Sequence, residues 1–462
     1  MKYYFLGIAG TAMASVAVLL KQKGHEVWGS DQGIYPPMSD FLEANQIPVW
    51  QGFSEYHLKK PFDLAVIGNA LSRGNPEVEE ILDRQLPFVS LPELIRREFI
   101  DGRESIVITG THGKTTTTSL MSWVMECAGL NPGFMIGGIA NNFQSSIQLG
   151  GGKYFVIEGD EYDCAFFDKR PKFVHYFPKY LILNNIEFDH ADIYPDLASI
   201  KDVFRKLMRI VPRSGLVVAN GDDPAVREVI APIYSRLQVF SRESGDWSYR
   251  ILEKSPAGIA FEILEKGVSA GRFDFPFPGE FQVQNCLAVA AVARDLGIGW
   301  ETIADAFRSF RGVARRLDRW GTLHGAAVYD DFAHHPTAIR VTLAAMKEKF
   351  PDKRLVALFE PRTNTTVRNF FQEELARAFQ PADVVIISPV HRQERIPEKE
   401  RLSLPLLKTT LENEGKQVFC LSANSEIPEL LATTLKEGDV LVLLTNGSLG
   451  GEYQKLRAAV TR

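Results

Sequence analysis

The sequence lacks the features that mark membrane-spanning, secreted and nucleic-acid-binding proteins. It contains no uninterrupted apolar run of about 18 residues, so it predicts no membrane span. The formal net charge is −5, so no basic field favours a nucleic-acid partner. The chain runs from Met1 directly into the strand-like segment Tyr3–Gly7, which leaves no room for a signal peptide. We therefore expect a cytoplasmic protein whose partners are small molecules.

Cysteine is also scarce, and its spacing indicates neither a disulfide framework nor a metal site. The four cysteines are far apart in the sequence: Cys127, Cys164, Cys286 and Cys420. Isolated cysteines of this kind are typical of a reduced cytosolic protein.

The chain does contain a repeated alternation of short apolar strands and helical stretches. Its 462 residues, 45% of them hydrophobic, suggest about three domains with sizeable cores. The alternation predicts three α/β blocks with parallel sheets, over residues 1–102, 103–312 and 313–462. Residues 248–278 differ, because alternating strands around a Pro-Ala-Gly turn predict a small antiparallel sheet within the second block.

The most informative motif is a glycine turn in the second block, directly after the apolar segment Ser105–Thr109. Backbone N–H groups of such a turn point at a phosphate, Lys114 adds a positive charge, and Thr115 offers a hydroxyl to a bound magnesium ion. The longer phosphate-loop pattern wants glycine where this chain has Ile108, so an ordinary glycine turn is the alternative. We expect ATP to bind to Gly110, Thr111, His112, Gly113, Lys114, Thr115 and Thr116.

The first block opens with a similar turn, Gly7–Met13, and Asp31 ends its second strand. This is the layout of a dinucleotide fingerprint in which alanine replaces two glycines, so the block is predicted to be Rossmann-like. A plain βαβ turn fits the sequence equally well. A second polar turn, Gly68–Pro76, would face the same edge of the sheet.

Two acidic segments follow strands of the second block. Glu158–Asp163 comes after the strand Lys153–Ile157, and Asn184–Asp192 comes after Tyr180–Leu183. Ligands of open α/β sheets bind beyond the carboxyl ends of the strands, so both segments are expected to converge on the nucleotide. Carboxylate and imidazole groups there suit divalent cations that bridge phosphate oxygens. The alternative is a solvated acidic loop.

Polar loops also follow the strands of the third block, which is predicted to be Rossmann-like as well. Asp330–Pro336 and Glu360–Thr365 are two of these loops. His334 and His335 are either ligands or acid–base groups, or they fill the first turn of a helix that begins with Pro336.

These groups together imply that three substrates are brought together at one site. One consistent chemistry is carboxylate activation, in which a carboxylate takes the γ-phosphoryl group of ATP and an amine then displaces phosphate from the acyl phosphate. Magnesium, Lys114 and an arginine are needed to offset the repulsion between like-charged reactants. Arg315 and Arg316 are placed by sequence to reach the phosphates, unless they form an exposed basic pair.

The motifs resemble those of the Mur ligase family, the ATP-dependent amide-forming enzymes of peptidoglycan assembly. Over essentially the whole chain they stand in the family's order and spacing: Gly110–Thr115, Glu158–Asp163, Asn185–His190, Arg315-Arg316 and Asp330–Thr337. The resemblance implies three domains, with a Rossmann-like domain on each side of a central P-loop ATPase-like domain.

Further stretches resemble one branch of that family, the one that uses UDP-N-acetylmuramate. Within the branch they are more similar to members that attach the recycled tripeptide L-alanyl-γ-D-glutamyl-meso-diaminopimelate than to members that add L-alanine. The stretches include Tyr35–Met38, Gly68–Glu77, Phe188–Ile193, Glu360–Thr365 and Asn446–Gly451.

The resemblance also implies roles for single residues on the ATP side. Lys114, His190 and Arg316 would be catalytic, with Lys114 on the β/γ-phosphates and Arg316 on the transferred phosphate. Two magnesium ions are expected, the first on Thr115 and Glu158 and the second on His190. The residues expected near the adenine and the ribose are Asn285 and Asp331.

The first block would hold UDP-N-acetylmuramate, and the third block would hold the peptide. Arg362 is expected to bind a peptide carboxylate. The residues expected to bind the sugar nucleotide are Ala9, Gly10, Thr11, Ala12, Met13, Ser30, Asp31, Asn69 and Ser72. The chain departs from the family at Phe281-Gln282, where His-Asn is usual, and this changes the expected packing around adenine.

Two other functions remain open from sequence alone. One is the L-alanine-adding ligase of the same branch. The other is a regulatory protein that hydrolyses ATP and forms no amide, although such a switch does not need a third block with an acceptor pocket.

Overall fold

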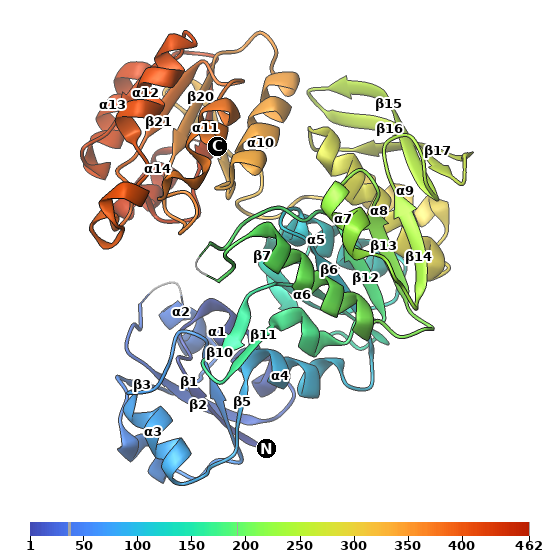
Figure 1. Ribbon diagram of the computed structural model, residues 1–462, viewed down its shortest axis with the longest axis vertical. Coiled ribbons are helices and arrows are strands. Elements are labelled where there is room, and N and C mark those ends of the chain that lie inside the picture. The colour runs from blue at the N-terminus through green and yellow to red at the C-terminus, as the bar shows by residue number, and fades with distance from the viewer. Residues whose placement is uncertain (36–37, 192, 462) are drawn as a thin grey trace.

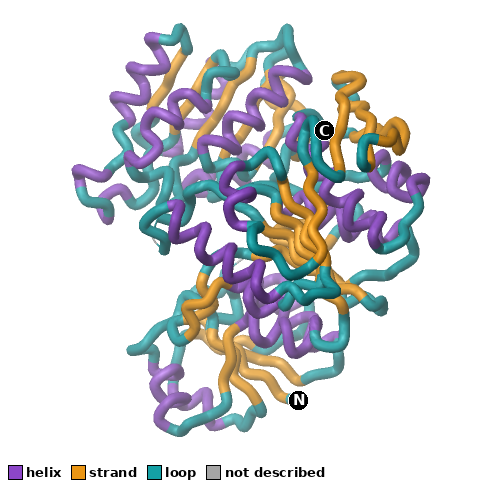
Figure 2. Tube along the Cα trace, turned by 45° about the vertical axis from the view of Figure 1, so that its right-hand side comes forward, coloured by secondary structure: helices purple, strands orange, loops and turns teal. Residues whose placement is uncertain are grey.

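The computed structural model describes residues 1–35, 38–191 and 193–461, and within these ranges the chain forms three α/β regions (Figure 1). The central region lies between the N-terminal and C-terminal regions, and each has strands flanked by helices (Figure 2). The predicted α/β class is confirmed. Pro36, Pro37, Asp192 and Arg462 lie outside the described residues, and with them parts of Tyr35–Met38 and Phe188–Ile193.

The N-terminal region is built on a parallel sheet of apolar strands. Its described strands and helices are β1 (Lys2–Leu6), β2 (Glu26–Asp31), β3 (Val49–Gln51), β4 (Leu64–Ile67), β5 (Phe88–Ser90), α1 (Thr11–Gln22), α2 (Met38–Ala44), α3 (Pro76–Asp83) and α4 (Leu91–Ile95). The strand order is β3-β2-β1-β4-β5. The strands are all parallel, and the order in which the chain adds them reverses between β1 and β4. The turns after these two strands, Gly7–Gly10 and Gly68–Asn75, therefore flank the switch point where such sheets bind ligands.

The central region contains the largest sheet. Its described strands are β6 (Glu104–Thr109), β7 (Gly133–Ala140), β8 (Ser145–Gln148), β9 (Tyr154–Gly159), β12 (Tyr180–Leu183), β13 (Leu216–Asn220), β14 (Arg236–Phe240), β15 (Trp247–Ser255), β16 (Gly258–Glu265) and β17 (Val268–Phe275). They are ordered β17-β16-β15-β14-β13-β12-β6-β9-β7-β8. The antiparallel strands β15–β17 were predicted, and they continue the parallel sheet through the single pair Phe240–Trp247.

Helices cover both faces of the central sheet because their buried sides are apolar. They are α5 (Lys114–Cys127), α6 (Leu197–Ile210), α7 (Pro224–Val229), α8 (Glu280–Asp295) and α9 (Trp300–Arg308). Helix α8 is buried almost all round and forms one core with α5, α9 and the antiparallel strands. A core of this kind fixes the start of α5, where the phosphate-binding turn lies.

The C-terminal region has its own sheet, ordered β18-β19-β23-β20-β21-β22 among the described strands and parallel except for β18. The elements are β18 (Asp318–Leu323), β19 (Ala326–Asp331), β20 (Leu355–Phe359), β21 (Val384–Ile387), β22 (Gln417–Cys420), β23 (Val440–Leu444), α10 (Pro336–Lys349), α11 (Gln372–Ala378), α12 (Leu404–Asn413), α13 (Ile427–Thr434) and α14 (Glu452–Ala459). The polar loops after β19, β20 and β23 lie at one edge, as the sequence predicts.

Two sets of contacts join the N-terminal region to the central one. The Phe99 ring lies 6.1 Å from that of Phe155 on β9. The hairpin of β10 (Asp163–Ala165) and β11 (Asp168–Pro171) reaches back, so that Phe167 packs on Phe88 with 4.9 Å between the ring centroids. Among the described residues no helix is long and apolar enough to cross a membrane, and the four cysteines are free.

Candidate functional site

The turn between β6 and α5 is shaped as a cradle for an anion. Gly110 and Gly113 have φ values of +131° and +83°, which side chains other than glycine rarely adopt. A Cβ atom at Gly113 would lie 3.0 Å from both Asn184 Nδ2 and Asn285 Oδ1. Lys114 opens the helix, and its ammonium donates a hydrogen bond of 2.7 Å to the Gly110 carbonyl. Glycine is therefore favoured at both positions. The N–H groups of Thr111 and His112 donate to Asn185, which fixes the shape of the turn.

Carboxylates from the strand β9 and its trailing loop surround Lys114. The Lys114 Nζ atom lies 3.3 Å from Glu161 Oε2 and 4.0 Å from Asp160 Oδ1. Although burial favours the neutral amine, the negative charges of Glu161, Asp160 and Glu158 raise the pKa of Lys114. The ammonium is therefore held charged at the point where phosphate oxygens would enter.

Glu158 is the carboxylate closest to the start of α5. It accepts hydrogen bonds from the Thr115 hydroxyl, at 3.1 Å, and from the Gly137 N–H. Burial, together with the nearby charge of Asp160, raises its pKa. A partly buried carboxylate of raised pKa beside a threonine hydroxyl suits a divalent cation, because the ion would stabilise the ionised form.

A second carboxylate, Glu161, pairs with His190. Glu161 is 2% exposed, and its Oε1 atom lies 2.9 Å from His190 Nε2. Burial opposes ionisation of Glu161, but Lys114 and His190 together lower its pKa to about 2. Burial likewise opposes protonation of His190, yet Glu161 and Asp189 raise the pKa of the imidazole. Of the predicted metal ligands, Thr115 and Glu158 thus lie together, whereas His190 pairs with Glu161, which was not predicted.

Arg316 brings the C-terminal region to the phosphate-binding turn. Its Nη2 atom donates a hydrogen bond of 3.2 Å to the Thr115 hydroxyl, across 201 positions of sequence. The guanidinium also lies over the Phe332 ring, 4.9 Å from its centroid. The Arg315 guanidinium instead donates a hydrogen bond of 2.7 Å to the Thr445 carbonyl. The two adjacent arginines therefore have different positions, and only Arg316 reaches the turn.

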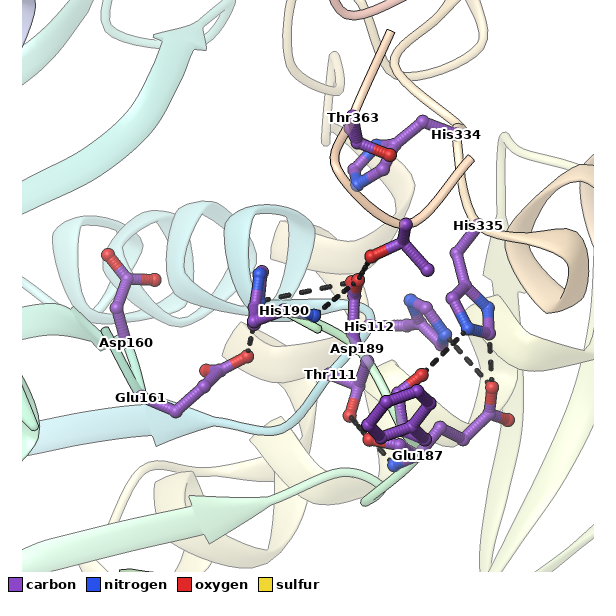
Figure 3. Close-up of polar contacts among 12 residues, drawn as sticks. Thr111, His112, Asp160, Glu161, Glu187, Asp189, His190, His334, His335 and Thr363 are labelled. Atoms are coloured by element: carbon purple, nitrogen blue, oxygen red, sulfur yellow. Dashed lines mark hydrogen bonds and ion pairs between the residues drawn. The ribbon is translucent and has the colours of Figure 1, made fainter. Parts of the chain in front are cut away.

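Three side chains from three segments meet beside the turn: His112, Glu187 and His335 (Figure 3). Glu187 Oε2 lies 3.2 Å from His112 Nε2 and 3.4 Å from His335 Nδ1. Burial opposes ionisation of Glu187, but the hydrogen bonds from His112 and Thr337 lower its pKa to about 2. This cluster connects the phosphate-binding turn, the loop after β12 and the first turn of α10.

His335 also caps α10. The Thr337 N–H donates to His335 Nδ1 at 3.3 Å, while His335 Nε2 lies 3.2 Å from the Phe188 carbonyl. One neutral tautomer, with the proton on Nε2, satisfies both contacts, and burial lowers the pKa of His335 to about 4. His335 was predicted to be either a ligand or acid–base group, or a residue that fills the start of the helix. The second prediction is confirmed, because His335 is the N-cap of α10, and the same ring contacts Phe188 of the central region.

The residue predicted to lie near the adenine is at the start of α8, and the one predicted near the ribose ends β19. Asn285 is buried, and its amide donates a hydrogen bond of 3.2 Å to Gln282. Phe281, which stands where the family has histidine, packs against the C-terminal core. Asp331 is buried as well, and its two carboxylate oxygens accept from the N–H groups of Leu317 (2.7 Å) and Ala333 (2.8 Å).

The turn of the N-terminal region is held by Asp31. Its carboxylate accepts 2.9 Å hydrogen bonds from the N–H groups of Ala9 and Gly33, so it ties the turn to the end of β2. Gly10 is the N-cap of α1 and offers no side-chain cap, which leaves the first N–H groups of the helix open. Ser30 is fully buried, and its hydroxyl donates to Glu77 at 2.6 Å.

The other predicted sugar-nucleotide residues surround this turn. Thr11 and Ala12 are exposed at the start of α1, whereas Met13 is buried beneath them. Asn69 is exposed on the second turn, and its amide donates to the Asp163 carbonyl of the central region at 3.1 Å. Ser72 is exposed on the same turn.

Arg362 lies at the ligand edge of the C-terminal sheet. Its Nη1 atom is 3.3 Å from Glu360 Oε1, and its side chain is 33% exposed. Glu360 is buried and also accepts from the Thr445 hydroxyl. The guanidinium is therefore held by one buried carboxylate and has an open side that can meet a second one.

Sequence reasoning chose Glu158 from the acidic segment and passed over Glu161, which makes the tighter contacts with Lys114 and His190. It also left out Glu187 and Asp189. Asp189 accepts a hydrogen bond of 2.7 Å from the Thr365 hydroxyl of the C-terminal region. Their only sequence signal is membership of an acidic segment that follows a buried strand, a signal shared with solvated carboxylates.

Family comparisons match all three regions. The Mur ligase family, catalytic domain, matches residues 2–99, the Mur ligase middle domain matches 108–293, and the Mur ligase, glutamate ligase domain, matches 315–447. The phosphate-binding turn, the acidic loops and Arg316 all fall within these matches.

Full-length relatives lead to the same family. The chain is 39% identical over 458 residues to the Escherichia coli UDP-N-acetylmuramate–L-alanyl-γ-D-glutamyl-meso-2,6-diaminoheptandioate ligase, covering 99% of this chain and 97% of the relative. It matches a murein peptide ligase from Psychrobacter arcticus with a TM-score of 0.74 at 33% identity, over 99% and 98% of the two chains. It matches a UDP-N-acetylmuramate–alanine ligase from Thermotoga maritima with a TM-score of 0.81 at 25% identity, over 99% of each chain. The chain therefore belongs to the Mur ligase family.

Proposed function

We propose that the protein is an ATP-dependent ligase that joins UDP-N-acetylmuramate to the tripeptide L-alanyl-γ-D-glutamyl-meso-diaminopimelate, in peptidoglycan recycling. The observation that carries the proposal is the 39% identity, over nearly the full length of both chains, to a ligase whose name gives those substrates. Residues 1–102 would bind the sugar nucleotide, 103–312 would bind ATP, and 313–462 would bind the peptide.

The phosphate-binding turn supports the assignment of ATP to the central block. The turn has glycines at which a Cβ atom would crowd its neighbours, a partly buried lysine at the helix start, and an arginine that reaches it from the C-terminal region. Positive groups in this arrangement suit the γ-phosphoryl group, because its charge must be offset before a carboxylate can attack it. Lys114 and Arg316 would offset that charge.

The carboxylates beside the turn fit magnesium. Thr115 and Glu158 would hold one ion, and His190 and Glu161 would hold a second. Magnesium would supply positive charge between the phosphate oxygens. Glu161 suits this role because it is ionised and buried, and the raised pKa of Glu158 would return to its usual range beside a cation.

The reaction then has two steps. A carboxylate oxygen of UDP-N-acetylmuramate bonds to the γ-phosphorus, and ADP leaves. The amine of the tripeptide attacks the acyl carbon, phosphate leaves, and the amine loses a proton. Interdomain contacts through His335 and Thr365 would help to exclude water, which would hydrolyse the acyl phosphate.

A substrate comparison tests the proposal. The protein is incubated with ATP, magnesium and UDP-N-acetylmuramate, with either the tripeptide or L-alanine, and phosphate release and the UDP-linked product are both measured. The proposal expects a higher kcat/KM for the tripeptide. A higher kcat/KM for L-alanine would overturn it, and ATP turnover without a UDP-linked product would indicate a regulatory ATPase instead.

A second candidate is UDP-N-acetylmuramate–L-alanine ligase. The observation in its favour is the TM-score of 0.81 with the Thermotoga maritima enzyme, above the 0.74 with the murein peptide ligase. The TM-score compares whole chains, so it depends on how the domains are arranged as well as on the active site. Sequence identity, 25% against 33% for the same two structures, favours the tripeptide ligase.

A further inference from the structure

A cavity lies at the junction of the central and C-terminal regions, and it shares Arg316 with the phosphate-binding turn. Its volume is about 480 Å³, and its walls come from the segment before α8, the connecting segment 311–319, the strand β19 and the last turns of α10. In Figure 1 this is where α10 faces the antiparallel strands β15–β17. An exposed ion pair of 3.0 Å between Lys254 of β15 and Glu348 of α10 joins the two regions.

Positive charge gathers on the lining of this cavity. Arg311, Arg316, Arg319 and Lys349 line it, against the single carboxylate of Asp318. Within the described part of the chain, none of these four cations forms an ion pair with a carboxylate. Burial and the charge of Arg319 lower the pKa of Lys349, so the two cations disfavour each other in the absence of an anion.

Flat apolar groups form the rest of the lining. Phe277, Tyr329 and Phe350 contribute rings, and Pro276 and Pro278 lie beside them. The Tyr329 and Phe350 rings are in contact, with 6.0 Å between their centroids. The Lys349 ammonium lies 5.8 Å from the centroid of Phe350. A planar ring can therefore pack on these aromatic side chains while an anion meets the charges of Arg319 and Lys349.

We propose that this cavity, which we name the hinge cavity, binds a nucleoside diphosphate at a site separate from the phosphate-binding turn. Its volume lies within the range of small-molecule sites. Of the residues assigned above to ATP, only Arg316 lines it, so the ATP site and the hinge cavity share that arginine and no other assigned residue. Because a ligand there would contact both regions, it would favour the relative domain position seen in this structure.

Binding is tested with GDP as the probe. The full-length protein is first saturated with magnesium and a non-hydrolysable ATP analogue at the turn, and with UDP at the N-terminal site. GDP is then titrated in by calorimetry. We expect one further site per chain, and we expect the double substitution Arg319→Ala with Lys349→Met to weaken it by about tenfold or more.

The matched control is Arg377→Ala, which removes an exposed arginine of α11 in the same region, paired with Glu373 and absent from the cavity lining. It should leave GDP binding unchanged, and all variants should bind the ATP analogue as the parent does, which shows that they fold. No GDP binding to the parent, or equal binding by the double variant, would overturn the proposal. A pyrophosphate titration tests the aromatic wall, because pyrophosphate binding as tight as that of GDP would rule out recognition of a nucleoside.

Discussion

The turns after β1 and β6 share one architecture but differ in charge. Each links a buried parallel strand to a helix whose N-cap is glycine, Gly10 in the first and Gly113 in the second, so backbone N–H groups are open at both. The second turn adds Lys114 and, from the C-terminal region, Arg316. The residues of the first turn, Gly7–Gly10, include no lysine or arginine, and the turn is held by Asp31. Backbone geometry is enough to hold a diphosphate, whereas transfer of a phosphoryl group needs added positive charge.

Lys114→Ala should separate the two turns most strongly. It removes the partly buried cation at the second turn, so we expect kcat/KM for ligation to fall by roughly a thousandfold or more. UDP-N-acetylmuramate binding, measured by calorimetry, should change less than about twofold, because the first turn is untouched. Lys153→Ala is the control, since Lys153 is an exposed lysine that pairs with Glu104 at the opposite end of the same sheet. A variant that ligates at the parent rate would remove Lys114 from the mechanism.

Asp31→Ala is the reciprocal change at the first turn. It removes the acceptor of two N–H groups, so the turn keeps its backbone hydrogen bonds to Ser30 of β2 but loses the one from Ala9 to the Asp31 side chain. We therefore expect sugar-nucleotide binding to weaken by about tenfold. Affinity for the ATP analogue should stay within about twofold. If both affinities fell together, the two turns would not act as separate sites.

The buried carboxylates Glu161 and Asp330 give a second comparison, through pH. Burial opposes ionisation of both, but Lys114 and His190 lower the pKa of Glu161 to about 2. For Asp330, burial raises the pKa to about 7 despite the hydrogen bond from Tyr453 and the charge of Arg315. The folded state therefore holds the Asp330 proton more tightly than the unfolded state does. Its contribution to stability is present below about pH 4 and is lost as the pH rises through about 7.

Asp330→Asn removes this titration. Between pH 5 and pH 8 the parent should lose a few kcal/mol of unfolding free energy from this group, and the variant should lose less. Thermal unfolding across that range measures the difference. Parallel pH profiles for the two proteins would contradict the assignment.

The smallest effect is expected at His335, where two roles can be separated. His335→Asn keeps a side chain that can cap α10 but is too short to reach Phe188, whereas His335→Ala loses both contacts. We expect alanine to lower the unfolding free energy by about 1 kcal/mol more than asparagine does. His324→Asn, an exposed histidine of the same region, is the control. Equal stability of the alanine and asparagine variants would show that the cap contributes nothing.

The sequence predicted the parts of the site that are local in the chain. The phosphate-binding turn, Thr115 and the order of the polar loops follow from strand, glycine and helix signals within a few residues of one another. The adjacent arginines were predicted as a pair, but only tertiary structure gives Arg316 and Arg315 different partners.

Pairs distant in sequence were not predicted. Glu161 meets His190 across 29 positions and His335 meets Phe188 across 147, and neither distance leaves a local pattern. Strand β18 was also missed, because its polar residues suit an exposed edge and resemble a loop. The glycine-rich strand β7 was missed because glycine is depleted in strands.

Isotope transfer tests the central claim, that a sugar-nucleotide carboxylate attacks ATP before the amide forms. UDP-N-acetylmuramate labelled with oxygen-18 in its carboxylate is coupled to the tripeptide, and the released phosphate is analysed by mass spectrometry. The acyl-phosphate route predicts one labelled oxygen in phosphate for each amide bond formed. Label retained wholly in the UDP-linked product, during coupling that consumes ATP, would contradict it.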